Sequence, residues 1–185
     1  MKEDIVIEEK EQNIKKKSFW KKLLLFFLFL CVLFYLYIRF IEPSMLVVHE
    51  YAIIDNHLPS SFHGMKIVHF SDILYGTTMN EKNLEKVVQN INNLNPDIVL
   101  FTGDSFNSNL ILNDINKQNL KNILSKIKAT YRKYAIIGDN DYIDKNAFMD
   151  IWESVDFIVL NNTYDVFYYK GPDPLVFIGT NSLLE

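Results

Sequence analysis

The sequence is poor in the residues that several common kinds of functional site require. One cysteine, Cys31, in 185 residues excludes an internal disulfide framework and any cysteine-rich zinc site. The 19 Lys and Arg residues stand against 23 Asp and Glu residues, so no basic footprint for nucleic acid is indicated. The sequence contains no glycine-rich phosphate loop, no Ser-His-Asp arrangement and no internal repeat. Its length allows one ordinary domain and an appendage.

The longest apolar stretch predicts a transmembrane helix. Residues 23–38 are 16 consecutive apolar or aromatic residues, and flanking side chains extend the span to residues 20–42. A bilayer core of about 30 Å needs roughly 20 helical residues. Five lysines lie in residues 15–22 and only Arg39 follows closely, so the N-terminus is expected in the cytoplasm. Pro43 is expected to end the helix, and the protein is predicted to be a single-pass protein of the cell membrane.

A cleaved signal peptide is the alternative to this anchor. A cleavage site of small residues does not follow the run, because residues 39–43 are bulky and charged. The pattern therefore favours an uncleaved signal anchor. Residues 1–19 are charged, mixed in sign and short of apolar residues, and are expected to form a mobile cytoplasmic tail.

Residues 43–185 show strands alternating with amphipathic helices. A first strand is expected at residues 46–54, and buried strands at 65–71, 98–101 and 134–137. Helices are predicted after Asn80, around Leu120 and after Asp144. This alternation predicts an α/β fold with βαβ units and a parallel sheet. Short strands at residues 157–160, 165–169 and 175–178 predict an antiparallel section, the last two forming a hairpin.

Acidic turns follow three of the predicted strands. Asp72 follows the first buried strand, Asp104 the second, and Asp139 and Asp141 the third. Ligands of such sheets bind at the carboxyl ends of the strands, so these turns are expected to be neighbours. Carboxylate oxygens are ligands of hard divalent cations. The sequence therefore predicts one metal site at this edge.

Three segments resemble the motifs of a known family. Ser71–Gly76, Thr102–Asp104 and Gly138–Tyr142 are similar to the first three motifs of the calcineurin-like metallophosphoesterases, Asp-x-His-x-Gly, Gly-Asp and Gly-Asn-His-Asp. The similarity covers residues 40–182 and is greatest to the membrane-anchored bacterial branch. The resemblance implies that the βαβ units form part of an αββα sandwich. It also implies two divalent metals, such as Mn, Fe or Zn, and hydrolysis of phosphomonoesters or phosphodiesters.

The resemblance assigns roles to individual residues. Asp72 corresponds to a ligand of the first metal, and Asp104 to the aspartate that bridges both metals. Asp139 stands where the family has an asparagine ligand of the second metal. Asn140 and Asp141 occupy the catalytic positions. The glycines of the three turns are Gly76, Gly103 and Gly138.

Three departures from the family pattern bear on activity. Leu74 stands where the family has a metal-ligand histidine, and leucine has no donor atom. Asn140 replaces the catalytic histidine, and an amide cannot deliver a proton near neutral pH. The late Gly-His-x-His motif does not occur before Glu185, so residues 43–185 are expected to be a partial domain, truncated at the C-terminus. His69 is expected to be a packed strand residue and not a replacement ligand.

Two functions remain open on the sequence alone. The first is a membrane-anchored phosphoesterase, with impaired or lost activity, whose site is rebuilt around the three aspartates and Asn140. The second is a non-catalytic, degenerate or truncated member of the family that acts as a binding module or has no function.

Overall fold

The computed structural model describes residues 2–41, 46–76, 79–107, 112–180 and 182. The chain divides into two compact units, Met1–Val48 and His49–Glu185.

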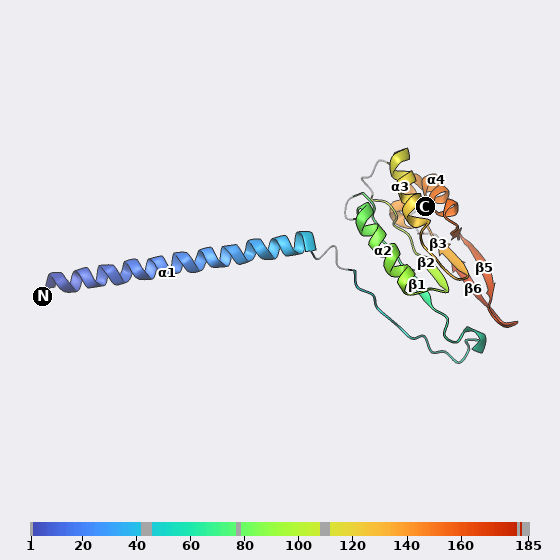
Figure 1. Ribbon diagram of the computed structural model, residues 1–185, viewed down its shortest axis with the longest axis horizontal. Helices are drawn as coiled ribbons and strands as arrows, with labels where there is room; N and C mark the ends of the chain where they lie inside the picture. The colour runs from blue at the N-terminus through green and yellow to red at the C-terminus, as the bar shows by residue number, and fades with distance from the viewer. Residues whose placement is uncertain (1, 42–45, 77–78, 108–111, 181, 183–185) are drawn as a thin grey trace. The chain divides into compact units, whose positions relative to one another are not determined.

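The N-terminal unit is helical. Helix α1, Lys2–Leu36, is followed by a π-helical turn, η1, Tyr37–Ile41 (Figure 1). Within it, Phe19–Arg39 has a mean hydropathy of 2.1, and none of its described residues is buried inside the protein. By length and composition this helix is long and apolar enough to cross a membrane. Pro43, expected to end the helix, lies outside the described residues.

Residues 2–19, part of the stretch expected to form a mobile cytoplasmic tail, are helical, and the mobility and location of this stretch stay predictions. The helix begins at Lys2 and continues without a break into the apolar run. Lys, Glu and Ile dominate this stretch, and the first two are strong helix formers. A charged segment too polar to form a core can therefore still extend a helix that the apolar run already stabilises.

The second unit contains the predicted parallel sheet. Its strands are β1, Ile67–Phe70, β2, Ile98–Phe101, β3, Arg132–Ala135, and β4, Ile158–Val159. They lie in the order β1-β2-β3-β4, and all three neighbouring pairs are parallel. The mixed α/β class is therefore confirmed. β4 corrects a detail, because residues 157–160 were expected in the antiparallel section and instead extend the parallel sheet.

Three helices connect the strands, and side chains cap them as the sequence predicts. Helix α2, Glu81–Asn93, begins at Asn80, whose side chain accepts a hydrogen bond from the Asn83 N–H. Helix α3 is Asp114–Leu124, and helix α4, Lys145–Ser154, begins at Asp144. Two short 3-10 helices, η3, Ser60–Phe62, and η4, Asp139–Asp144, complete the helical elements of the described residues.

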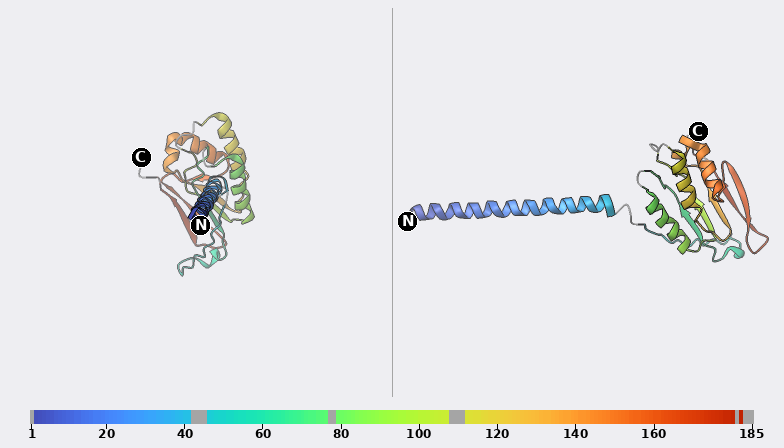
Figure 2. Two further views of the ribbon diagram at one scale, coloured as in Figure 1. Left: turned by 90° about the vertical axis from the view of Figure 1, so that its left-hand side faces the viewer. Right: turned by 45° about the horizontal axis from the view of Figure 1, so that its top comes forward.

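The parallel sheet has a core on each face. On one face Val99 and Phe101 pack with the three helices, and Trp152 of α4 stacks on Phe101 with ring centroids 4.1 Å apart. On the other face Ile98 and Tyr134 pack against the hairpin of β5, Thr163–Tyr168, and β6, Pro174–Gly179. Side chains alternate along a strand, so β2 supplies both cores. The layers are therefore helices, parallel sheet and hairpin (Figures 1 and 2).

The hairpin is confirmed, and the first expected strand is wrong. β5 and β6 pair antiparallel, from Thr163 opposite Gly179 to Tyr168 opposite Pro174. Residues 46–54, expected as a strand, have no strand assignment. Their composition suits a strand, but a strand also needs a neighbour to pair its backbone groups, and no neighbour among the described residues provides one.

Candidate metal centre

The predicted acidic turns lie at one edge of the parallel sheet. Asp72 follows β1, Asp104 follows β2, and η4 begins at Asp139 beyond β3. Because β1, β2 and β3 are parallel and in register, their carboxyl ends open onto the same edge. This part of the sequence prediction depends only on strand direction, and the structure bears it out.

Backbone hydrogen bonds join the first two turns. The N–H groups of Asp72, Leu74 and Tyr75 donate to the carbonyls of Gly103, Asp104 and Ser105, each over 3.0 Å. The two turns therefore run side by side past the ends of β1 and β2. Asp72 and Asp104 are held on neighbouring backbone segments as a result.

These turns also contain unusual backbone conformations. Asp72, Leu74 and Asp104 have positive φ angles of 55°, 46° and 63°, and Gly76 and Gly103 have 104° and 95°. Left-handed backbone is unfavourable for residues other than glycine, by roughly 1–2 kcal/mol each. Such residues cluster at functional sites, where the surrounding structure holds them in place.

Gly103 and Gly138 bring the second and third turns into direct backbone contact. A Cβ added to Gly103 would overlap the nitrogen and Cα of Gly138. A Cβ added to Gly138 would overlap the Asp104 nitrogen and carboxylate. The absence of a side chain at both positions is therefore required by the approach of two backbones.

Asp141 ties these turns together from inside the protein. It is fully buried, and its carboxylate accepts hydrogen bonds from the N–H groups of Gly138, Asp104 and Ser105 at 2.8–3.0 Å. Burial raises the pKa of Asp141 to about 6, although the three N–H donors oppose the change. The Asp141 side chain is shielded from solvent, and its three hydrogen bonds hold the turns together.

Ser105 and Trp152 support this arrangement, and sequence reasoning missed both. The Trp152 indole N–H donates to the Ser105 hydroxyl oxygen over 2.9 Å, and both side chains are buried. A tryptophan in the helical core needs an acceptor for its N–H. The serine directly after Gly103-Asp104 was the available signal.

Asn140 holds the carboxylate of Asp104. Its backbone N–H donates to Asp104 Oδ1 over 3.0 Å, and its side-chain Nδ2 donates to Asp104 Oδ2 over 2.8 Å. Both oxygens of the aspartate predicted to bridge two metals are thus hydrogen-bonded by one residue. We call this pair of bonds the Asn140–Asp104 clasp.

The remaining predicted site residues are dispersed around the clasp. Asp72 is exposed and accepts a hydrogen bond from the Ser71 hydroxyl, and Asp139 is exposed at the start of η4. His69, expected to be packed, is exposed in β1, where its Nε2 lies 2.7 Å from Thr102 Oγ1. The prediction that His69 is packed is wrong, because β1 presents this side chain on the part of the sheet that the hairpin core does not cover.

The donor set does not fit the two-metal centre that the resemblance implies. Across residues 46–76, 79–107 and 112–180, no three His, Cys, Asp or Glu side chains come together to hold a metal ion. Leu74 adds no donor atom, and the clasp takes one lone pair of each Asp104 oxygen. Asp72, Asp104 and Asn140 supply oxygen donors only, which suit a hard cation better than a transition metal.

Two cavities flank the sheet. One of about 580 Å³ adjoins the first acidic turn. It is lined by Tyr75, Gly76, Met79, Asn80, Glu81, Lys82 and Asn116. Glu81 is fixed there, because its Oε1 accepts from the Tyr75 hydroxyl over 3.2 Å and from Asn119 Nδ2 over 2.6 Å.

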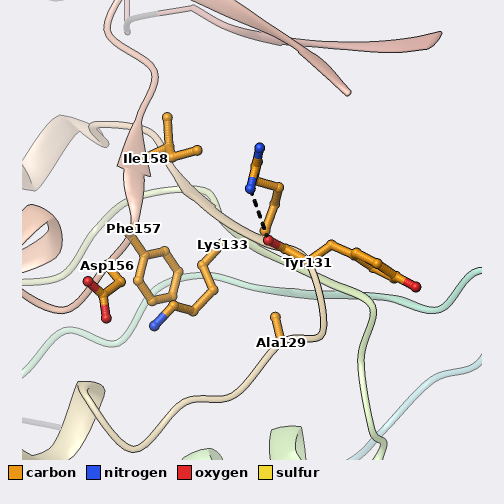
Figure 3. Close-up of a pocket in the computed structure, with 7 residues that line it drawn as sticks. Ala129, Tyr131, Lys133, Asp156, Phe157 and Ile158 are labelled. Atoms are coloured by element: carbon orange, nitrogen blue, oxygen red, sulfur yellow. Dashed lines mark hydrogen bonds between the residues drawn. The ribbon is translucent and has the colours of Figure 1, made fainter. Parts of the chain in front are cut away.

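The second cavity, of about 420 Å³, lies at the opposite edge, where β3 and β4 begin (Figure 3). Lys133 Nζ lies over the Phe157 ring, 5.2 Å from its centroid, and donates to the Val155 carbonyl over 2.7 Å. Burial lowers the pKa of Lys133. The Lys133 ammonium group of β3 is thus hydrogen-bonded to the residue that follows α4.

The fold and the acidic turns together define the class of protein to which the second unit belongs. Parallel strands that end in acidic, glycine-bearing turns, with a hairpin covering the second face, form a metallophosphoesterase-type α/β domain. Residues 65–183 match the model of the calcineurin-like phosphoesterase family. The chain belongs to this family.

Similar proteins extend the comparison. The chain is 32% identical over 108 residues to the metallophosphoesterase YkuE of Bacillus subtilis, covering 58% of the chain and 37% of YkuE. It is 32% identical over 114 residues to the UDP-2,3-diacylglucosamine pyrophosphatase LpxG of Chlamydia muridarum, covering 60% and 33%. A transmembrane protein with metallophosphoesterase domain from Danio rerio is 30% identical over 112 residues, covering 58% and 24%. The matched region thus spans well under half the length of each relative.

Proposed function

We propose that this protein is a membrane-anchored member of the calcineurin-like phosphoesterase family whose hydrolytic activity is lost or strongly reduced. The Asn140–Asp104 clasp is the observation that carries the proposal. A carboxylate that bridges two metals must offer lone pairs to both cations, and here Asn140 takes one lone pair of each Asp104 oxygen and turns N–H groups, which cannot bind a metal, toward the carboxylate.

Residue chemistry supports the same proposal. Leu74 offers no ligand at a position where the family has a histidine, so one coordination bond is lost. Asn140 can donate a hydrogen bond to a phosphate but cannot protonate a leaving group near neutral pH. The missing ligand at Leu74 weakens metal binding, and the missing proton donor at Asn140 slows the chemical step. These two effects are independent of each other.

The second candidate is an active phosphoesterase with a rebuilt site. The contact between Gly103 and Gly138, together with the buried Asp141, favours it, because the backbone frame of the family's turns is intact. In this case Asp72, Asp104, Asp139 and Asn140 bind divalent metal and a phosphomonoester or phosphodiester. LpxG is named for a pyrophosphatase activity on a diacylated sugar nucleotide, so a phosphate compound held at a membrane is the corresponding substrate class.

Hydrolysis by the full chain distinguishes the two candidates. We expect the protein, purified in detergent with Mn²⁺, to hydrolyse bis(p-nitrophenyl) phosphate no faster than Asp104→Asn. A wild-type rate clearly above that of Asp104→Asn would establish the rebuilt enzyme and overturn our proposal.

A double variant tests metal binding separately from hydrolysis. Leu74→His with Asn140→His restores the two family residues at once, and its thermal transition is measured with and without Mn²⁺. We expect Mn²⁺ to raise the melting temperature of the double variant more than that of the wild type. This readout reports metal binding even if hydrolysis is not recovered.

The membrane assignment is part of the proposal. The N-terminus is in the cytoplasm, α1 crosses the cell membrane as an uncleaved anchor, and the phosphoesterase domain, residues 43–185, is on the outer side. The lysines before the span and the apolar character of Phe19–Arg39 support this orientation.

A further inference from the structure

The charges of helix α1 are segregated along its length. Residues 2–11 contain five acidic residues and two lysines, and we call residues 3–11 the acidic segment. Residues 12–22 contain five lysines and no acidic residue, and the next acidic residue is Glu42. We call the five lysines the lysine collar; they are Lys15, Lys16, Lys17, Lys21 and Lys22. The collar thus directly precedes the apolar run, and the acidic segment lies beyond it.

A continuous helix fixes the distances between these charged segments. α1 runs without a break from the acidic segment through the collar into the apolar run (Figure 1). At about 1.5 Å per residue, Lys15 lies about 9 Å from Lys21 along the axis, and Glu11 lies about 15 Å from Lys21. An unstructured segment of the same sequence would instead let its acidic residues approach the lysines. The helix therefore keeps the two kinds of charge apart.

Screening by salt determines which of these charges act at a membrane surface. Lys21 and Lys22 are exposed and directly precede the apolar run, so in a membrane-spanning α1 they lie at the level of the lipid headgroups. The Debye length at physiological ionic strength is about 8 Å. The collar thus lies within about one Debye length of the headgroups, whereas the acidic segment starts about two Debye lengths away. The acidic residues therefore leave the attraction of the collar for anions largely uncancelled.

We infer that the lysine collar binds the phosphate groups of anionic phospholipids in the leaflet that it adjoins. Lysine ammonium groups next to a membrane span are attracted to anionic headgroups, each adding to the binding. Successive residues of a helix are about 100° apart, so Lys15, Lys16 and Lys17 lie on three sides of α1. Several lipids can therefore be bound around the helix at once. The inference rests on the proposed membrane anchor and adds a ligand to it.

Trp20 reports on the lipid beside the collar. It is 60% exposed and adjoins Lys21, whereas the other tryptophan, Trp152, is fully buried in the second unit and gives a constant background. The full chain is reconstituted in phosphatidylcholine vesicles that contain an equal fraction of phosphatidylglycerol or phosphatidylcholine with brominated acyl chains. We expect brominated phosphatidylglycerol to quench Trp20 about threefold or more efficiently than brominated phosphatidylcholine does. High salt is expected to remove the difference.

A charge exchange tests the position of the lysines along the helix. The variant with Glu8→Lys, Glu9→Lys, Lys16→Glu and Lys17→Glu keeps the composition and the net charge of α1 but brings two carboxylates into the collar. We expect it to lose the preference for phosphatidylglycerol. A preference that survives this exchange would show that position along the helix is irrelevant and would overturn the inference.

Two triple variants with the same change in charge separate the collar from the other lysines. One replaces Lys15, Lys16 and Lys17 by Gln and is expected to lose the preference. The other replaces three exposed lysines of the second unit by Gln and is expected to keep it; these are Lys66, Lys86 and Lys128. Equal behaviour of the two triple variants would overturn the inference.

The remaining outcomes distinguish this inference from the membrane anchor. A chain that enters the vesicles but is quenched equally by both lipids overturns the inference and leaves the anchor standing. A chain that stays outside the vesicles overturns the anchor and the inference with it. Excess inorganic phosphate at matched ionic strength is expected to leave the quenching unchanged. Relief of quenching by this phosphate would assign the collar to free phosphate and overturn the lipid as its ligand.

Discussion

Leu74 combines an unusual backbone conformation with a side chain that has no donor atom. Its φ of 46° lies in the left-handed region, which Asn, Asp and His occupy several times more often than other non-glycine residues. The family's histidine suits both this backbone conformation and metal binding. Leucine suits neither, so the turn is maintained by its neighbours and not by Leu74 itself.

The protonation of Asp141 makes the stability of the fold depend on pH. Its pKa of about 6 in the folded protein lies above the ordinary value of 3.8, because burial penalises the charged form. The folded chain therefore binds a proton more tightly than the unfolded chain does. The resulting stabilisation is fully present below pH 3.8 and is lost as the pH rises through about 6.

We predict that Asp141→Asn removes this pH dependence. The wild type is expected to lose on the order of 2–3 kcal/mol of unfolding free energy from this group between about pH 4 and pH 7, at 1.4 kcal/mol per unit of pKa. Urea denaturation of both proteins across this range measures it. The comparison uses the slope against pH, since the amide also places an NH₂ group against three N–H donors and lowers stability at every pH. Parallel slopes would refute the assignment.

At the scale of elements, the hairpin depends on a glycine that sequence reasoning did not single out. Gly179, at the end of β6, abuts Leu160 and the Ile136 side chain. Gly171, in the loop of the same hairpin, leaves a new Cβ 3.2 Å from the Ser61 Cβ. Gly179 therefore sets the distance between hairpin and sheet, whereas a Cβ on Gly171 would press only on the Ser61 side chain, by a few tenths of an ångström.

We predict that Gly179→Ala destabilises the domain by about 2 kcal/mol or more, because the Cβ meets backbone and packed side chains that cannot both yield. Gly171→Ala is the comparison, with an expected loss of about 1 kcal/mol or less, because only the Ser61 side chain has to move. Chemical denaturation gives both values. Amide hydrogen exchange should show the loss of protection concentrated in β5 and β6. Equal effects of the two substitutions would contradict this account of the contact.

At the scale of the whole molecule, the chain combines a helix suited to a membrane with a domain suited to water. Phe19–Arg39 exposes large apolar side chains along its length, and the second unit has its own core on both faces of the sheet. A membrane would offer the helix an environment in which these side chains avoid water.

We predict the orientation of the chain from its lysines. In a Cys31→Ser background, a membrane-impermeant maleimide added to bacterial spheroplasts should label Glu50→Cys and leave Glu8→Cys unlabelled until the membrane is permeabilised. The reason for this expectation is the five lysines before the span, which predict a cytoplasmic N-terminus. Labelling of Glu8→Cys in sealed spheroplasts would reverse the orientation, and release of the domain into the medium would instead indicate a cleaved signal peptide.

The sequence by itself determined the elements and the edge on which the candidate site lies. Hydrophobic periodicity and caps such as Asn80 and Asp144 located the helices, because these signals are local. The rule that parallel strands end at one edge placed Asp72 and Asp104 together before any coordinates. The departures at Leu74 and Asn140 were also visible in the sequence.

Only the tertiary structure decided how the groups at that edge are used. The Asn140–Asp104 clasp, the three donors around Asp141 and the Ser105–Trp152 bond join residues 36 or more positions apart, except for the Gly138 donor. Long-range partners also decided that residues 46–54 form no strand and that β4 joins the parallel sheet. Local patterns report what a segment favours, whereas a buried polar group or an unpaired strand is settled by which partner the fold brings to it.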